Sequence, residues 1–328
     1  MSDSRRGVLA VALPSRGTLS PAAYELLTAG RGLADALKEP LCAVVLAGSK
    51  AGELAKDLAE RGADKIFTIE HPSLENFNDE LCAKAVAGLV EREKFARLLL
   101  PSSVAGRSLA ARLAVLLRAG LAVEVSELIP NGSGLKAKRS QYSGNVVSEI
   151  EFKSPVQIVT LQGMAYPRAE RQAARLAEIA AVPFEPEPSH IEFISFEPEQ
   201  SSEIDLGAAE RVVSGGRGLG NAEGFKLLRE LAHAIQAAVG ASRAAVDSGW
   251  IAYRHQIGLT GRSVRPKLYI ACGVSGQIQH LAGMSSSGTI VAINTDPEAP
   301  MMQTASISVV GDLSEIVPKV IEEIKKRR

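Results

Sequence analysis

The sequence predicts an α/β protein of two domains, each built on a mostly parallel β-sheet with covering helices. The chain has 328 residues, of which 46% are hydrophobic. A chain of this length usually forms about two domains, each with a core of its own. Short apolar runs alternate with Ala- and Leu-rich amphipathic stretches, which is the pattern of βαβ units. Only 4% of the residues are aromatic, so the cores must consist mainly of aliphatic side chains.

The elements of the first half follow from this alternation. One doubly wound domain accounts for all of them, and we expect it to occupy residues 1–185. Between about Val182 and Glu203 the chain has four prolines, many glutamates and no helical period, which predicts a linker at 186–204. The expected strands are 7–13, 41–48, 64–70 and 96–103, and the expected helices are 21–37, 53–62, 78–95 and 106–120, the last closed by Gly120.

Charge and cysteine usage exclude several classes of function. Lys plus Arg and Asp plus Glu are equal at 37 each, so no excess charge attracts the chain to nucleic acid or to an anionic membrane. The three cysteines, Cys42, Cys82 and Cys272, lie far apart, and no histidine has metal-ligand spacing. We therefore predict no disulfide and no metal site.

The apolar segments are short. No uncharged apolar segment reaches the roughly 18 residues that a membrane span needs, and the N-terminal residues lack a cleavage-site pattern. We expect no transmembrane segment, no nucleic-acid partner and a cytoplasmic location.

The second half, residues 205–328, predicts a domain whose strands end at polar residues. Its first strand is followed by a turn with four glycines between Gly215 and Gly220, and Arg217 stands inside it. Glycines let backbone N–H groups approach a phosphate at a helix start, and a cation would reinforce such a site. The spacing is not that of the full dinucleotide motif, so an ordinary strand-to-helix turn is an equal alternative.

The other strand ends repeat this arrangement. Because ligands of open parallel sheets bind at the carboxyl ends of the strands, these ends together predict a nucleotide-cofactor site. For the second strand, simple capping of the next helix is the alternative. The ends are Ser242 with Arg243, the turn with Ser275 followed by a helix with Gln277, Gln279 and His280, then Asn294 and Asp312; a further loop places Gly258 and Gly261 around Thr260.

At this point the motifs resemble a known family. GGRGLG, ASRAAVDSGW, QIGLTGRSVRPKLYIACGVSGQIQHLAGM, TIVAINTDPEAP and VVGDL closely resemble the α subunit of electron transfer flavoproteins over residues 205–320. The first domain resembles the family more loosely, through GADKIF, LLLPSSVAGRSLAARLA and SGNVVSEI.

The resemblance implies an electron carrier rather than an enzyme with turnover of its own. It implies FAD in the C-terminal domain, 205–328, and a smaller β subunit that completes a heterodimer and docks on the first domain. Electrons would arrive from flavin dehydrogenases, such as acyl-CoA dehydrogenases, and leave to a quinone oxidoreductase.

The resemblance also implies which residues bind the cofactor. His280 is expected to bond the pyrimidine edge of the flavin, where negative charge collects on reduction. Arg243 is expected beside the ring and Thr260 near its N5 edge, whereas Leu259 departs from the Gln of many members. The implied residues are Arg217, Ser242, Arg243, Gln256, Ile257, Gly258, Leu259, Thr260, Ser275, Gly276, Gln277, Ile278, Gln279, His280, Asn294, Asp312 and Leu313.

Arg243 would then influence the reduction potential. Two unit charges about 4 Å apart at an effective dielectric near 20 interact by roughly 4 kcal/mol, on the order of 170 mV for a one-electron couple before screening. We expect Arg243 and His280 to favour reduction of the flavin by single electrons.

Two other functions stay open. In an electron-bifurcating relative, NADH reduces a further FAD in the partner subunit and the electrons divide between acceptors of high and low potential. In a third interpretation, the protein is a nucleotide-binding module without redox function.

Overall fold

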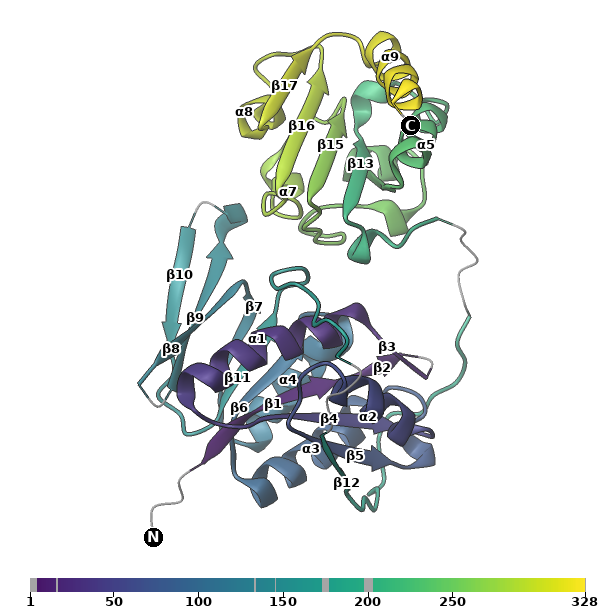
Figure 1. The fold of residues 1–328 in the computed structure, drawn as a ribbon. Helices are drawn as coiled ribbons and strands as arrows, with labels where there is room; N and C mark the ends of the chain where they lie inside the picture. The colour runs from purple at the N-terminus through teal and green to yellow at the C-terminus, as the bar shows by residue number, and fades with distance from the viewer. Residues whose placement is uncertain are drawn as a thin grey trace. The chain divides into compact units, whose positions relative to one another are not determined.

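The computed structural model describes residues 5–15, 17–132, 134–144, 146–172, 177–197 and 203–327. The chain divides into two compact units, one of residues 1–140 with 147–197, the other of 141–146 with 198–328 (Figure 1). Each unit has its own sheet and its own core, so each is described by itself.

The first unit contains a seven-stranded sheet, and its strands pair in parallel. Parallel pairing buries both faces, and β1, β4 and β6 are accordingly almost continuous apolar runs. The strand order is β12 (Glu178–Ala181), β5 (Lys65–Glu70), β4 (Leu41–Ala47), β1 (Arg6–Ala12), β6 (Phe95–Pro101), β11 (Gln157–Leu161) and β7 (Gly120–Val125).

Helices cover both faces of this sheet. Val8 and Ala10 of β1 pack in the core with α1 and α2, whereas Leu9 and Val11 pack with α3 and α4. Successive strand residues point to opposite faces, which explains why neighbours in β1 belong to different cores. The helices are α1 (Pro21–Leu37), α2 (Ala51–Ala59), α3 (Asp79–Glu93) and α4 (Val104–Leu116).

One helix end differs from the prediction. Gly120 does not close the helix: α4 ends at Leu116, Arg118 takes the left-handed conformation with φ 47°, and Gly120 begins β7. A Cβ on Gly120 would stand 2.9 Å from the Phe152 ring and from the Ser154 hydroxyl. The glycine is therefore required by this close approach and not by a helix cap.

A second small sheet was not predicted. It contains β8 (Glu127–Asn131), β9 (Gly134–Gln141) and β10 (Val146–Glu151), in the order β10-β9-β8. β8 and β9 pair antiparallel. A two-stranded pair, β2 (Pro14–Ser15) with β3 (Thr18–Leu19), precedes α1.

The second unit contains five strands that pair in parallel. α5 and α9 pack on one face with Val213 and Ile270, and α8 packs on the other with Tyr269 and Ala271. The strand order is β14 (Ala238–Ala241), β13 (Arg211–Gly215), β15 (Leu268–Cys272), β16 (Thr289–Asn294) and β17 (Ile307–Val310); the helices are α5 (Gly224–Ile235), α6 (Arg243–Asp247), α7 (Ile278–Leu281), α8 (Pro300–Thr304) and α9 (Leu313–Lys326).

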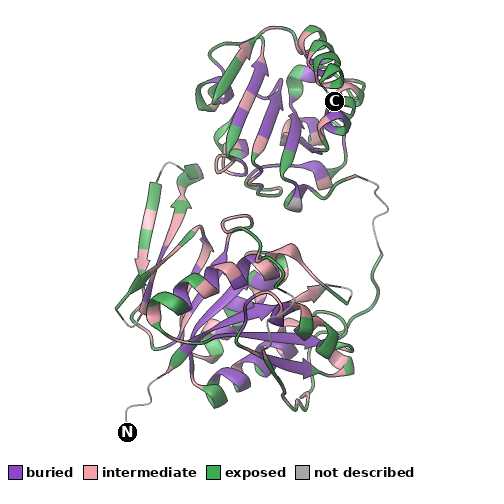
Figure 2. Cartoon of the chain, in the orientation of Figure 1, coloured by how far each residue is buried: buried purple, intermediate pink, exposed green. Residues whose placement is uncertain are grey.

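The predicted fold class, two mostly parallel sheets with covering helices, is confirmed. Buried residues follow the central strands of both sheets, whereas the edge strands β12 and β17 are largely exposed (Figure 2). Of the predicted linker, 186–204, residues 198–202 lie outside the described part, and 186–197 contain neither helix nor strand. Among the helices that the structure describes, none is both long and apolar enough to span a membrane.

Candidate functional site

A groove of about 520 Å³ lies at the carboxyl ends of the second unit's strands. Arg217 follows β13, Ser242 follows β14, Ser275 follows β15 and Asn294 ends β16, and all four line it. This is the edge at which open parallel sheets bind their ligands. The structure thus brings together four of the five strand ends that the sequence indicated.

Glycines allow two turns to approach each other at the base of the groove. The Gly218 N–H donates to the Gly273 carbonyl at 3.0 Å. A Cβ on Gly218 would stand 2.7 Å from the Gly273 Cα, and one on Gly216 would stand 2.2 Å from the Gly273 carbonyl oxygen. Only glycine fits at these positions, and the two turns together form a glycine cradle beside Arg217.

α6 places a cation in the groove. Ser242 is the N-cap of this helix, and its Oγ accepts a 3.4 Å bond from the Ala245 N–H. Arg243, the first helical residue, is 66% exposed, and its Nε lies 3.2 Å from Oδ2 of Asp247. Ser242 therefore caps α6 and also lines the groove, so its role toward a cofactor stays a prediction.

The loop Gln256–Thr260 contributes residues 257–260 to the lining of the groove. Gln256 is buried, and its Nε2 donates to the Thr260 Oγ1 at 3.1 Å. The Tyr253 hydroxyl donates to the Thr260 carbonyl at 2.5 Å. Leu259, 72% exposed, donates its N–H to the Gln279 carbonyl at 2.7 Å. Gln256 thus supports the loop from behind, and Leu259 and Thr260 face the groove.

His280 lies under the groove on α7. The ring is buried, with 6% of the residue exposed, and its Nε2 lies 2.8 Å from the Tyr269 hydroxyl. Its Nδ1 is buried without a hydrogen bond. Burial lowers the pKa of His280 to about 4, and the Ile257 backbone opposes part of that shift. The imidazole is therefore neutral at neutral pH.

The predicted residues divide into two groups. Those that line the groove are Arg217, Ser242, Arg243, Ile257, Gly258, Leu259, Thr260, Ser275, Gln277, Gln279, His280 and Asn294. Those that do not are Gln256, Gly276, Ile278, Asp312 and Leu313.

The structure shows what surrounds three of the residues that do not line the groove. A Cβ on Gly276 would stand 2.3 Å from the Met301 backbone nitrogen. Ile278 is 64% exposed. Asp312 caps α9 by accepting from the Ser314 N–H at 2.8 Å. The roles of all seventeen residues toward a cofactor stay predictions.

The prediction missed several lining residues. Asp247 lies four residues after Arg243, and this helical spacing could have indicated the pair. Asp296 follows Asn294 by two residues in a loop, where the sequence contains no comparable signal. The missed residues are Ala244, Asp247, Val274, Asp296 and Ala299, whereas Gly218 and Gly273 belong to the glycine turns that the sequence indicated.

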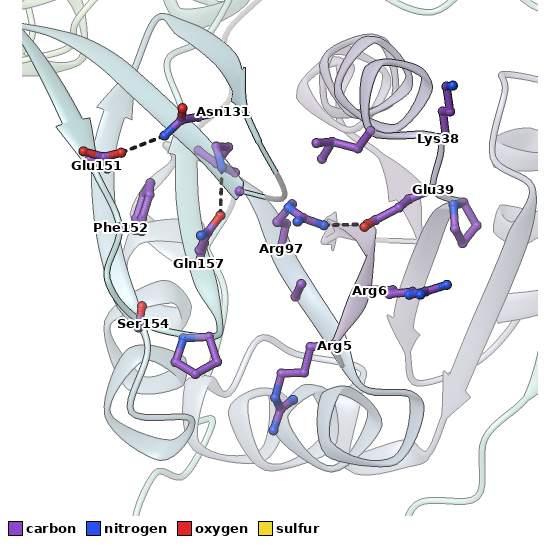
Figure 3. A pocket seen from close by; sticks show the side chains of 16 residues that line it. Arg5, Arg6, Lys38, Glu39, Arg97, Asn131, Glu151, Phe152, Ser154 and Gln157 are labelled. Carbon is purple, nitrogen blue, oxygen red and sulfur yellow. Dashed lines mark hydrogen bonds and ion pairs between the residues drawn. The ribbon is translucent and has the colours of Figure 1, made fainter. Parts of the chain in front are cut away.

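A larger cavity of about 840 Å³ lies in the first unit, at the amino ends of β1 and β11 (Figure 3). The Arg97 guanidinium points to Glu39 at 2.5 Å, and Asn131 donates to Glu151 at 2.7 Å. Because these polar groups bind one another, and because the cavity lies opposite the carboxyl ends of the strands, it is a poorer cofactor site than the groove.

The described residues show no other reactive centre. They contain no group of three or more His, Cys, Asp or Glu side chains that could hold a metal ion. Burial raises the pKa of the Cys272 thiol to about 12, so this cysteine, which ends β15, carries no thiolate at neutral pH.

A parallel sheet with a groove of glycine turns, cations and one buried neutral histidine defines a nucleotide-cofactor domain. Residues 205–285 match the family model of the electron transfer flavoprotein FAD-binding domain, and residues 8–187 match that of the electron transfer flavoprotein domain. The chain belongs to the electron transfer flavoprotein family and is similar to its α subunits.

Named relatives agree with this assignment. The chain is similar to the electron transfer flavoprotein subunit alpha of Thermoanaerobacterium thermosaccharolyticum, 42% identical over 94% of this chain and 95% of the relative. It is 35% identical to the subunit alpha of Bacillus subtilis over 94% of each chain. It is also 34% identical to Protein FixB of Clostridium saccharobutylicum, over 98% of this chain and 97% of the relative. The resemblance and the cofactor FAD are thereby confirmed.

The groove fits FAD chemically. Arg217 lines the groove beside the glycine cradle, where its guanidinium can pair with a phosphate of the cofactor. The unpartnered Nδ1 of His280 is a buried polar atom that lacks a hydrogen bond, as expected where a ligand supplies the missing partner.

Proposed function

We propose that this chain is the FAD-carrying subunit of a heterodimeric electron carrier. It would pair with an electron transfer flavoprotein β subunit, accept electrons from flavin dehydrogenases such as those acting on acyl-CoA, and deliver them to a quinone oxidoreductase. The observation that carries this proposal is the groove, which joins the ends of four parallel strands within the unit whose family model is named for FAD.

The residues that line the groove have different roles toward the cofactor. FAD, when bound, supplies the ring that takes up and releases electrons. Arg217 would hold the phosphates, and Arg243 would bring positive charge to the ring. Thr260, fixed by Gln256 and Tyr253, would offer its hydroxyl to the cofactor.

Of the two carboxylates that line this groove, Asp247 pairs with Arg243 and Asp296 accepts a hydrogen bond from the Glu298 N–H. His280 is neutral and buried, and Cys272 is a buried thiol. A site that orients a redox cofactor and adjusts its electrostatics, without turning over a substrate, fits a carrier better than an enzyme.

The experiment is an anaerobic reductive titration of the chain co-expressed with its β subunit. We expect one FAD per heterodimer and no reduction by NADH. Two FAD with rapid reduction by NADH would replace the simple carrier by the bifurcating type. A heterodimer that takes up no flavin would overturn the proposal in favour of a module without redox function.

A further inference from the structure

A buried polar contact in the second unit joins Tyr269 and His280. The Tyr269 side chain is fully buried among the aliphatic residues of β15 and its neighbours. Its hydroxyl lies 2.8 Å from the Nε2 of His280. A buried tyrosine hydroxyl needs a hydrogen-bond partner, and this contact joins the core of the sheet to a residue that lines the groove.

The contact constrains the proton of the imidazole. A neutral imidazole has one N–H donor and one acceptor nitrogen, and burial keeps His280 neutral by lowering its pKa to about 4. Burial also raises the pKa of the Tyr269 hydroxyl, although the neighbouring Ser214 side chain opposes this shift. The phenol therefore keeps its proton and can donate it to Nε2.

The other nitrogen then becomes the donor. With Nε2 accepting from Tyr269, the proton of the neutral ring resides on Nδ1, which is buried without a close hydrogen bond, although the Ile257 backbone lies near enough to the ring to influence its pKa. The ring belongs to the lining of the groove, so this N–H is the one that a ligand's acceptor oxygen can use.

We propose that Tyr269 is a positioning residue, which fixes His280 as the tautomer with Nδ1–H and so presents a hydrogen-bond donor to a carbonyl oxygen of the cofactor. The inference rests on the proposed function for the identity of that cofactor, but the tautomer itself does not depend on FAD. Fixing a histidine tautomer through a bond to its second nitrogen is an established way to orient such a ring.

The test is Tyr269→Phe in the heterodimer, because phenylalanine keeps the ring in the core and removes only the hydroxyl. The first readout is the 15N spectrum of labelled histidine, with the His280 signals assigned by their loss in His280→Gln. In the unmodified protein without FAD we expect a protonated Nδ1 and an unprotonated Nε2. In Tyr269→Phe we expect the other tautomer to appear.

The second readout is FAD affinity. Loss of a fixed donor should raise the Kd for FAD about threefold to tenfold, the effect of one neutral hydrogen bond. Tyr166→Phe is the matched control, since it removes a hydroxyl that binds the Leu128 N–H in the other unit and should change neither readout.

Two results would overturn the inference. One is a protonated Nε2 in the unmodified protein, because Nε2 would then donate to the phenol. The other is a Tyr269→Phe variant with unchanged tautomer and unchanged Kd. Failure of the unmodified heterodimer to bind FAD at all would instead reject the proposed function and leave the tautomer result standing.

Discussion

Arg243 and Asp247 form an ion pair inside the groove, with the guanidinium Nε 3.2 Å from the carboxylate Oδ2 and one helical turn between them on α6. Both side chains are more than half exposed, 66% and 61%, so the pair adds little to stability. Its effect concerns the ligand. The carboxylate orients the cation and also offsets part of its charge.

Asp247→Asn should therefore raise the reduction potential of bound FAD. Removal of a negative charge from the lining favours the more negative reduced cofactor, and because the site is partly exposed we expect a shift of a few tens of millivolts. A redox titration of the heterodimer measures it. Glu322→Gln, which removes an exposed acid of α9, is the control, and an Asp247→Asn potential equal to that control would contradict the prediction.

Arg243→Ala should lower the reduction potential of bound FAD, the opposite of the effect of Asp247→Asn. Loss of the cation lowers the potential, by less than the roughly 170 mV upper limit of an unscreened pair, and raises the Kd for FAD. Arg211→Ala is the matched control, because Arg211 lies at the amino end of β13 and donates to the Ile235 carbonyl. If both one-electron potentials of Arg243→Ala match those of the control, Arg243 does not lie near the ring.

Gly218→Ala should impair FAD binding strongly, although the substitution adds only one methyl group. The added methyl would meet the Gly273 Cα at 2.7 Å, so one of the two turns must move and the cradle opens. We expect the Kd for FAD to rise at least tenfold, the equivalent of about 1.4 kcal/mol, as measured by fluorescence titration.

Gly88→Ala is the control for that substitution. Gly88 is exposed in the middle of α3 and a Cβ there meets nothing within 4 Å. Alanine should stabilise this helix by about 1 kcal/mol and leave FAD affinity unchanged. A Gly218→Ala protein that binds FAD as well as Gly88→Ala does would show that the turns are not rigid.

The sequence predicted those features of the fold that repeat with a fixed period. The alternation of apolar runs and amphipathic helices indicated both parallel sheets. The rule that ligands bind at strand carboxyl ends predicted one groove for Arg217, Ser242, Ser275 and Asn294, because parallel strands bring their ends to a common edge. A periodic pattern can be recognised from neighbouring residues alone, so it requires no knowledge of tertiary contacts.

Features that depend on a single tertiary contact were not predictable in this way. Gly120 has the appearance of a helix cap in the sequence, yet the approach of Phe152 and Ser154 decides its place. The hairpin of β8 and β9 carried a usable signal: Asn131 pairs with Gly134, and the sequence between them is Gly132 and Ser133, a dipeptide typical of two-residue hairpin turns. The bond between Tyr269 and His280 had none, because it joins a core strand to a helix eleven residues later.

Acidification should destabilise the chain through His280. The folded pKa is about 4, whereas that of an unfolded histidine is about 6.5, so between these values the unfolded chain binds a proton that the folded chain does not. Stability is therefore complete above pH 6.5 and decreases as pH falls. Between pH 7 and pH 5 this one group should cost about 2 kcal/mol.

His280→Gln should remove the part of the pH dependence of stability that His280 contributes. The measurement is urea unfolding of the full-length chain without FAD at pH 7 and pH 5. We expect the unmodified chain to lose about 2 kcal/mol more free energy of unfolding than the variant over this interval. His233→Gln is the control, because His233 is exposed on α5 and should leave the loss unchanged. If the free energy of unfolding decreases equally in the unmodified chain and in His280→Gln, the folded protein protonates His280 as easily as the unfolded chain does. The ring would then be less buried than its place beside Tyr269 implies.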